Sequence, residues 1–196
     1  GGAVSAEPTK LPVAGVMVDA VTPSEACDRV MAAADAGQAL SVSALAVHGV
    51  MTGVDDPEHL YRLNHLGMVT PDGQPVRWAL NWLHGTKLQE RVYGPTLMLD
   101  ACRQAEQKRF PVFLFGSSSE VVQDLMAGLL KKFPNLQIAG SEPSQFRTGT
   151  DEEADALATR IRESGARLCF VGLGCPRQEV FVYEMAPRCS MPMLAV

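Results

Sequence analysis

The second half of the chain alternates between short apolar runs and amphipathic segments, and this pattern constrains the fold more than any other feature. Short apolar runs predict buried strands at residues 111–115, 136–139 and 167–172. Helical spacing of apolar residues follows each run, at residues 120–133, 151–164 and 176–185. Strands that alternate with helices at this spacing pair in parallel. We therefore expect an α/β fold, a single Rossmann-like domain whose mostly parallel sheet has helices on both faces.

The first half of the chain fits the same scheme. The predicted elements are a capped helix from Pro23 to Gly37, a buried strand at residues 40–47 closed by His48, a capped helix from Pro57, a helix at 78–83 and a long helix at 96–109. A loop is expected at residues 140–150, and a last strand at 191–196 has no element after it. We expect residues 1–10 to be a flexible terminus or an expression scar. Residues 11–196 should then form one core that is truncated at its C-terminal end.

Composition limits the class of protein and its partners. The 196 residues are 46% hydrophobic and 20% charged, which suits one domain with an ordinary core. The formal net charge of −5 argues against nucleic acid as a partner. The five cysteines form no C-x-x-C pair and the four histidines no H-x-x-x-H spacing, so neither disulfides nor a metal site are expected. This cysteine usage favours the cytoplasm, and no apolar run approaches the roughly 18 residues of a membrane span.

Three strand-to-helix corners compete for the functional site, because ligands of a parallel sheet bind beyond the carboxyl ends of its strands. The first is a Pro-Asp-Gly turn around Asp72, and Pro75 suits the first turn of the helix that follows. A carboxylate at such a corner can act as a general base. It can equally be an N-cap or part of an Asx turn, and the residues alone leave both interpretations open. The acidic pair Asp55-Asp56 precedes a proline, so we interpret it as a helix cap and not as a metal motif.

The second and third corners offer sites for an anion. Residues 116–119, Gly-Ser-Ser-Ser, open a helix and suit a phosphate or a nucleotide, although a plain helix cap explains them as well. Because neither a G-x-G-x-x-G nor a P-loop motif occurs, no dinucleotide cofactor is expected. At residues 172–179, Arg177 falls in the first turn of a helix, where its charge opposes the helix dipole. That charge indicates an anionic ligand or a partner carboxylate, with a solvated arginine as the alternative.

Four short motifs follow one another along the chain. They are Pro71-Asp72-Gly73 with Pro75, Val76 and Trp78; Arg91-Val-Tyr-Gly94-Pro-Thr-Leu-Met98; Phe113-Leu-Phe115-Gly116; and Val171-Gly-Leu-Gly174-Cys-Pro176-Arg177-Gln178-Glu179. In order and spacing they resemble the WecG/TagA/CpsF glycosyltransferases, over roughly residues 14–196. The resemblance implies an inverting, metal-independent enzyme that needs no cofactor. It would move a sugar, typically of N-acetylmannosamine type, from a UDP-sugar to a polyprenyl-diphosphate-linked sugar. This reaction belongs to cell-surface polysaccharide or cell-wall polymer synthesis on the cytoplasmic face of the bacterial membrane.

The resemblance also assigns roles to residues. Asp72 matches the aspartate proposed as the family's catalytic base, and inversion by direct displacement needs one such carboxylate. Arg91 and Arg177 are expected to contact the diphosphate or the acceptor phosphate. The other residues expected to bind substrate through this resemblance are Gly116, Ser117, Gly174, Gln178 and Glu179.

Two departures from the family pattern bear on function. Where the family carries Thr-x-Asn at the end of the second strand, this chain has Ala44 and Ala46, and Ser43 and His48 are the expected substitutes in the substrate site. The family's basic C-terminal segment, thought to reach the membrane, lies beyond Val196. Peripheral membrane contact is therefore expected through a segment that this chain lacks. The alternatives are a non-catalytic nucleotide- or partner-binding domain and another α/β enzyme of small-molecule metabolism, and family relatives also suggest a homo-oligomer.

Overall fold

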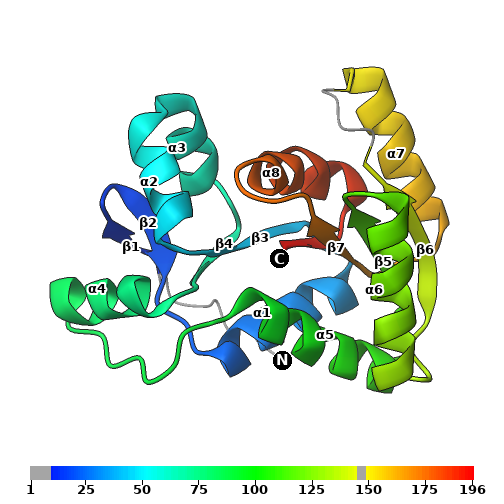
Figure 1. Ribbon diagram of the computed structural model, residues 1–196, viewed down its shortest axis with the longest axis horizontal. Coiled ribbons are helices and arrows are strands. Elements are labelled where there is room, and N and C mark those ends of the chain that lie inside the picture. The colour runs from blue at the N-terminus through cyan, green and yellow to red at the C-terminus, as the bar shows by residue number, and fades with distance from the viewer. Residues whose placement is uncertain (1–9, 145–148) are drawn as a thin grey trace.

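The computed structural model describes residues 10–144 and 149–196, and from β5 to β8 strands and helices alternate along the chain (Figure 1). The strands are β1 (Lys10–Val13), β2 (Val16–Asp19), β3 (Leu40–Leu45), β4 (Met68–Pro71), β5 (Val112–Gly116), β6 (Ile138–Pro143), β7 (Leu168–Gly172) and β8 (Pro192–Ala195). The helices are α1 (Pro23–Ala36), α2 (Val47–Asp55), α3 (Pro57–Asn64), α4 (Gln74–His84), α5 (Gly94–Lys108), α6 (Ser119–Lys132), α7 (Asp151–Glu163) and α8 (Arg177–Cys189).

The main sheet of the described residues has six strands in the order β4-β3-β8-β7-β5-β6, and every pairing in it is parallel. From β3 the chain moves outward to β4 and then crosses to β5 on the other side, and β8 returns to the middle beside β3. Because all strands run the same way, their carboxyl ends line one edge of the sheet. The C-terminus, at the end of β8, marks the middle of that edge in Figure 1.

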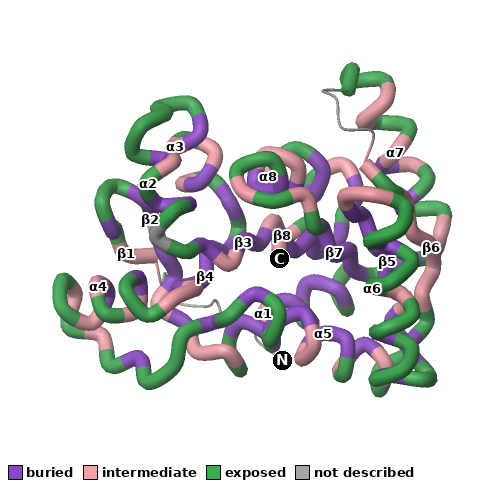
Figure 2. The backbone as a smooth tube through the Cα atoms, in the orientation of Figure 1, coloured by how far each residue is buried: buried purple, intermediate pink, exposed green. Residues whose placement is uncertain are grey.

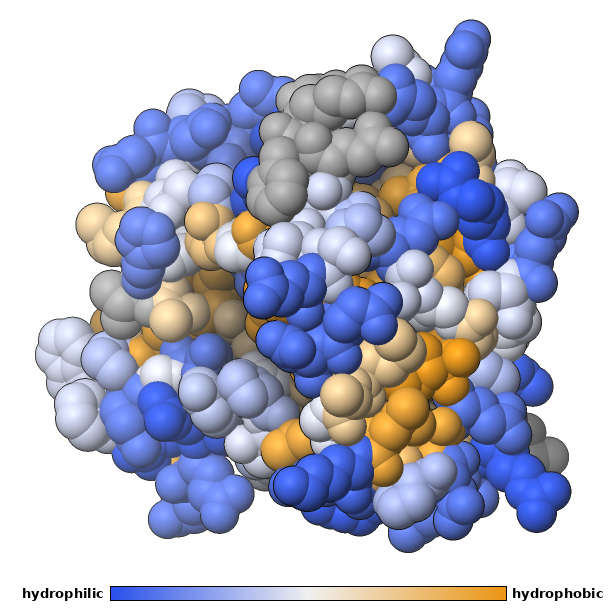
Figure 3. All heavy atoms as spheres, turned by 45° about the vertical axis from the view of Figure 1, so that its right-hand side comes forward, coloured by the Kyte–Doolittle hydropathy of each residue, from blue (hydrophilic) through white to orange (hydrophobic). Residues whose placement is uncertain are grey.

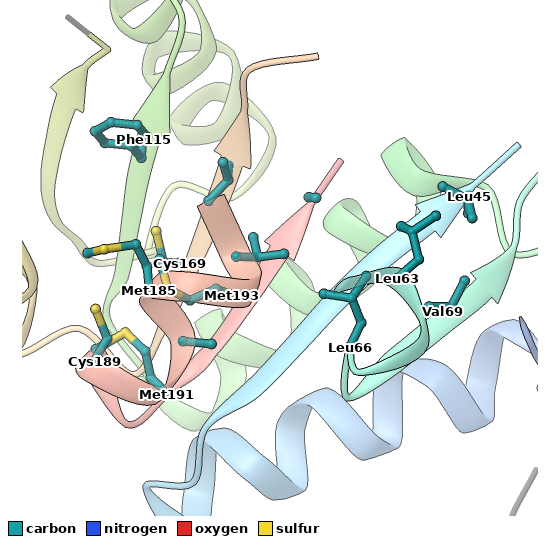
Figure 4. Packing of buried hydrophobic residues seen from close by; sticks show 14 of the residues in the cluster. Leu45, Leu63, Leu66, Val69, Phe115, Cys169, Met185, Cys189, Met191 and Met193 are labelled. Carbon is teal, nitrogen blue, oxygen red and sulfur yellow. The ribbon is translucent and has the colours of Figure 1, made fainter. Parts of the chain in front are cut away.

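Helices cover both faces of this sheet, and each face has its own hydrophobic core. Helices α1, α5 and α6 pack on one face, whereas α3, α7 and α8 pack on the other. Successive side chains of a strand point to opposite faces of the sheet, so each strand contributes to both cores: Phe113 and Phe115 face one layer, and Val112 and Leu114 face the other. Figure 2 shows the buried strands between helices that are exposed on their outer sides. The core beneath α8 is rich in sulfur, as the side chains of residues 185–193 show in Figure 4.

A buried carboxylate fastens the β1–β2 hairpin to the sheet. Asp19, 2% exposed at the end of β2, accepts a hydrogen bond from the N–H of Val69 at 2.8 Å. It also forms ion pairs with Lys10 at 2.9 Å and with Arg29 at 3.5 Å, which offset the cost of burying its charge. Because Val69 lies in β4, this contact fixes the strand that Asp72 follows.

The predicted α/β class and parallel sheet are confirmed, whereas several boundaries were wrong. Strand β3 ends at Leu45, and the next residues form α2, so His48 lies in the first turn of a helix and not at a strand end. Strand β6 starts and ends later than predicted, and it occupies part of the expected loop at 140–150. The rest of that loop includes residues 145–148, which lie outside the described residues, as do residues 1–9 of the expected flexible terminus. Helix α8 continues past residue 185 to Cys189.

Candidate active site

Asp72 lies at the carboxyl end of β4, where the chain turns directly into α4. Its N–H donates to the carbonyl of Thr70 at 2.9 Å, and Gly73 follows with a φ of +86°. Residues that have a side chain rarely adopt that φ, so glycine is the residue that permits the turn. Gly73 is the N-cap residue of α4, and this helix has no side-chain cap. The alternative that Asp72 is the N-cap is therefore wrong, and its carboxylate is available for other contacts.

The Asp72 carboxyl group is half-buried and is held by two segments of the chain. Burial raises its pKa above the ordinary value, whereas the charge of Arg91 and hydrogen bonds from the N–H groups of Gly73 and Gly94 act to lower it. The net change in pKa is upward, so this carboxylate is more basic than a solvated aspartate. A fixed, partly desolvated carboxylate with raised basicity has the properties of a general base.

Arg91 and Gly94 reach Asp72 because the loop after α4 is fastened to the end of β4. The N–H of buried Val92 donates to the last carbonyl of β4 at 3.1 Å. Arg91 precedes Val92 in the chain, and its guanidinium lies over the ring of Tyr93, 5.0 Å from the ring centre. Helix α5 begins directly after Tyr93, at Gly94. The structure thus brings together two residues predicted for the site, Asp72 and Arg91.

The N-terminus of α5 lies at the middle of the sheet edge. A Cβ added at Gly94 would lie 3.3 Å from the Cβ of Ala44 and 3.7 Å from the Cα of Val196, so the helix begins against the ends of β3 and β8. Its N-cap residue, Tyr93, makes no side-chain cap hydrogen bond. In this first turn the N–H of Gly94 binds Asp72 and Pro95 has no N–H, so the N–H of Thr96 is the donor that remains for an anion. The sequence predicted this helix from residue 96, but not that the N–H of Gly94 would bind Asp72.

The third corner, between β7 and α8, is held by polar contacts. Gly174 has a φ of +81°, and its N–H donates to the side-chain oxygen of Gln178 at 3.1 Å. Gln178 is buried, so its amide supports the turn from within. The exposed side chain of Arg177 donates to the hydroxyl of Ser144 at 3.3 Å, just beyond β6. The Arg177 guanidinium therefore lies at the rim of the same sheet edge as Asp72.

Ser43 and Glu179 form a buried pair behind this edge. The Ser43 hydroxyl donates to Oε1 of Glu179 at 3.0 Å, and the two residues are 0% and 1% exposed. The thiol of Cys175 hydrogen-bonds to the same residue, and burial together with the Glu179 charge raises the pKa of Cys175 to about 12. In this conformation Ser43 and Glu179 connect β3 to α8, and they support the site from behind.

His59 of α3 belongs to the same buried group, although no sequence pattern singled it out. It is 3% exposed, and burial lowers its pKa, against an opposing effect of Glu179. Among the described residues, neither its Nε2 nor Oε2 of Glu179 has a hydrogen-bond partner. Unpaired buried polar groups lower stability.

The remaining predicted residues are spread along the edge. His48 is exposed on α2, close to Ala46, whose Cβ lies 3.9 Å from the position of a Cβ added at Gly73. Gly116 ends β5 and Ser117 follows it. Since β5 lies four strand positions from β4, Gly116 is about 19 Å from Asp72 at the usual strand spacing. Gly174, after β7, lies between them.

Two further features of the described residues concern metal ions and membrane spans. They contain no group of three or more His, Cys, Asp or Glu side chains that could hold a metal ion. In the same part of the chain, every helix is too short or too polar to cross a membrane.

The sequence of this chain matches a known protein family. The match is to the Glycosyl transferase WecG/TagA/CpsF family and covers residues 11–196, so the chain belongs to this family. One relative is the N-acetylglucosaminyldiphosphoundecaprenol N-acetyl-beta-D-mannosaminyltransferase of Bacillus spizizenii, which is 28% identical over 131 residues. The transferase of the same name from Bacillus subtilis is 25% identical over 131 residues. Each alignment covers 67% of this chain and 49% of the relative, so the chain spans about half the length of these proteins.

Proposed function

We propose that the chain is the core of an inverting, metal-independent glycosyltransferase that uses a UDP-sugar. The donor sugar would be N-acetylmannosamine or a related hexose, and the acceptor a sugar linked to polyprenyl diphosphate. The observation that carries the proposal is the half-buried Asp72 carboxylate, with Arg91 and the start of α5 beside it at the sheet edge. The family and the names of the two relatives support this class of reaction and acceptor.

In the proposed reaction, Asp72 removes the proton from the acceptor hydroxyl while that oxygen bonds to the anomeric carbon of the donor. The bond between the anomeric carbon and the phosphate oxygen breaks, its electron pair stays on the phosphate, and UDP leaves. Attack from the side opposite to UDP inverts the anomeric centre, which requires one base and no covalent intermediate. The raised pKa of Asp72 favours this role, because a base is most effective when its pKa is near the operating pH.

The negative charge on departing UDP needs donors that are already in place. We assign this role to Arg91 and to the N–H of Thr96 in the first turn of α5. Arg177, which bonds Ser144 beside Gly116, would contact the nucleotide end of the donor. Gly116 and Ser117 would receive the nucleotide, and Gly174 would let it approach the backbone closely. Gln178, Ser43 and Glu179 would hold these corners in position, and His48 would lie at the rim.

We place this activity at the cytoplasmic face of the plasma membrane, where the protein would be peripheral and would serve polysaccharide or cell-wall polymer synthesis. Self-association into a homo-oligomer is a further part of the proposal. The lipid-linked substrate in the names of the relatives supports the membrane location.

Binding of UDP tests the proposal without any need for the acceptor. UDP at about 100 times its Kd should stabilise the protein by roughly 2.7 kcal/mol, which raises Tm by about 5 °C or more for a chain of this size. The rise should persist in EDTA, should extend to UDP-N-acetylmannosamine and should be absent with CDP as the matched control. If UDP, UDP-N-acetylmannosamine, UDP-glucose and UDP-glucuronate all leave Tm unchanged, the proposal is wrong.

A second function is supported by the alanines at the end of β3. Ala44 packs near Gly94 and Ala46 near Gly73, so neither position offers a side-chain hydrogen bond beside Asp72. A domain that binds a nucleotide or a partner without transferring a sugar would show the same arrangement. UDP binding with no transfer to any diphospholipid-linked sugar would favour this second function.

A further inference from the structure

Helix α4 exposes an aromatic face that the fold does not cover. Trp82 is 85% exposed, Trp78 is 57% exposed and Leu83 is 51% exposed. Trp78 and Trp82 are four residues apart, so they lie on the same side of the helix. The opposite side is buried, because Val76 and Leu80 pack into the core. Exposure of large apolar groups together on one surface indicates a surface that binds a partner.

The loop that follows α4 has an excess of positive charge. It exposes Lys87 and Arg91, and its exposed acidic residue is Glu90. The formal net charge of the whole sequence is −5, so this excess is not a general property of the chain. Tryptophan rings with nearby cations suit the interface of an anionic bilayer, where the rings enter the headgroup region and the cations meet lipid phosphates.

The position of the face connects it to the site. Helix α4 begins at Gln74, two residues after Asp72, and the loop that follows it returns to Asp72 through Arg91. A membrane surface in contact with α4 would therefore lie next to the proposed base. If the acceptor is a diphosphate on a lipid anchor, its sugar has to be reached close to the headgroups.

A second apolar face lies on α6, and its position distinguishes it from α4. Val121 and Leu125, four residues apart, are 52% and 37% exposed, and Leu130, on another side of the helix, is 39% exposed. Figure 3 brings forward the side of the molecule that carries α6, and apolar side chains appear there among polar ones. This helix follows β5, four strand positions away from β4, and its exposed apolar residues are aliphatic. It therefore serves as the matched control.

We propose that the exposed face of α4 formed by Trp78 and Trp82, which the loop with the exposed Lys87 follows along the chain, docks the protein on an anionic phospholipid bilayer. Docking through this face presents Asp72 to the headgroup level. This inference rests on the proposed function for one element, the lipid-linked acceptor. The docking surface belongs to the described fold and is separate from the segment beyond Val196 that the family resemblance suggested.

The chain contains two tryptophans, both on α4, so intrinsic tryptophan fluorescence reports on this face alone. The probe is a vesicle of phosphatidylglycerol and phosphatidylcholine, with and without brominated acyl chains. On binding, the emission maximum should move to shorter wavelength and brominated lipid should quench it. Vesicles of phosphatidylcholine alone should bind less protein. Trp82→Ser should weaken vesicle binding about tenfold, whereas Leu130→Ser on α6 should leave it unchanged.

Three results would overturn the docking surface. They are equal vesicle binding by wild type and Trp82→Ser, emission that shifts with protein concentration in the absence of lipid, and tryptophans already shielded from a soluble quencher before vesicles are added. The last two results would assign the face to a second copy or to another part of the protein. UDP binding, measured on the same samples, separates this inference from the proposed function. If the protein binds UDP but not vesicles, only the docking surface is wrong. If it binds vesicles but not UDP, only the proposed UDP-sugar donor is wrong.

Discussion

At the scale of single residues, the basicity of Asp72 is a balance between burial and neighbouring groups. Burial raises the pKa, and Arg91 and two backbone N–H groups lower it. The two kinds of effect come from different parts of the chain, because the N–H of Gly94 belongs to α5 and burial comes from the whole sheet edge. Each can therefore be changed by itself.

Replacing Arg91 by Gln should raise the pKa of Asp72, because a positive charge that favours the carboxylate is removed. A base with a higher pKa is protonated up to a higher pH, so the acidic limb of the kcat/KM profile should move upward in pH. Exposure of Arg91 to solvent keeps the shift modest. The matched control is Arg103→Gln, which removes a charge that pairs with Asp100. An acidic limb that stays in place or moves to lower pH in Arg91→Gln would show that Arg91 does not act on the base.

At the scale of elements, two glycines at the ends of adjacent strands have different reasons to be glycine. Gly116 of β5 and Gly172 of β7 are partners in register. A Cβ at Gly116 would lie 2.4 Å from a methyl group of Val122, which packs α6 against the strand end. A Cβ at Gly172 would meet nothing within 4 Å, and Gly172 has no positive φ. Close packing therefore requires glycine at Gly116 and not at Gly172.

Gly116→Ala should destabilise the fold by about 1–3 kcal/mol through this overlap. For a domain of this size, each kcal/mol lowers Tm by roughly 2–4 °C. Gly172→Ala should change the free energy of unfolding by no more than about 0.5 kcal/mol. Chemical denaturation of the two variants measures both effects. Equal stability of the two variants would mean that α6 does not press on the end of β5 as described.

The packing of α3 against α8 should depend on pH through His59. Burial holds the pKa of this imidazole below its ordinary value, so the folded state keeps it neutral while the unfolded state binds a proton more readily. The stability that His59 contributes is present above the unfolded pKa, near 6.5, and is lost as pH falls below it. The free energy of unfolding should therefore fall more between pH 7 and pH 5 in the wild type than in His59→Asn. A parallel fall in both proteins would contradict this assignment.

At the scale of the whole molecule, buried parallel strands were the part that the sequence predicted best. Strands β5 and β7 are continuous apolar runs because both of their faces are covered by helices. Helix α2 was missed because Gly49 and Gly53 resemble turn residues. A Cβ at Gly49 would lie 2.3 Å from a methyl group of Leu45, so this glycine serves close packing inside a helix. Strand β6 lies at the edge of the sheet and is only partly buried, and its Gly140 and Pro143 resemble a loop.

For the candidate site too, the sequence predicted what depends on neighbouring residues and missed what depends on distant ones. The sequence placed Asp72 at a strand-to-helix corner, because the turn chemistry lies within a few residues. It could not predict the contacts that decide the chemistry, since these join residues far apart in the chain. The Gly94 N–H reaches Asp72 from α5, on the far side of α4 in the chain, and Ser43 reaches Glu179 across 136 positions. Such contacts depend on which strands become neighbours in the sheet, and local patterns do not encode that order.

The proposed role of Asp72 as the base of a sugar transfer is tested most directly by a comparison of wild type with Asp72→Asn. The assay follows transfer of N-acetylmannosamine from its UDP derivative to a soluble diphospholipid analogue that carries N-acetylglucosamine, while UDP binding is measured on both proteins. We expect Asp72→Asn to transfer the sugar at least about 100-fold more slowly, with a Kd for UDP within about twofold of wild type. Transfer by Asp72→Asn at the wild-type rate would show that Asp72 is not the base.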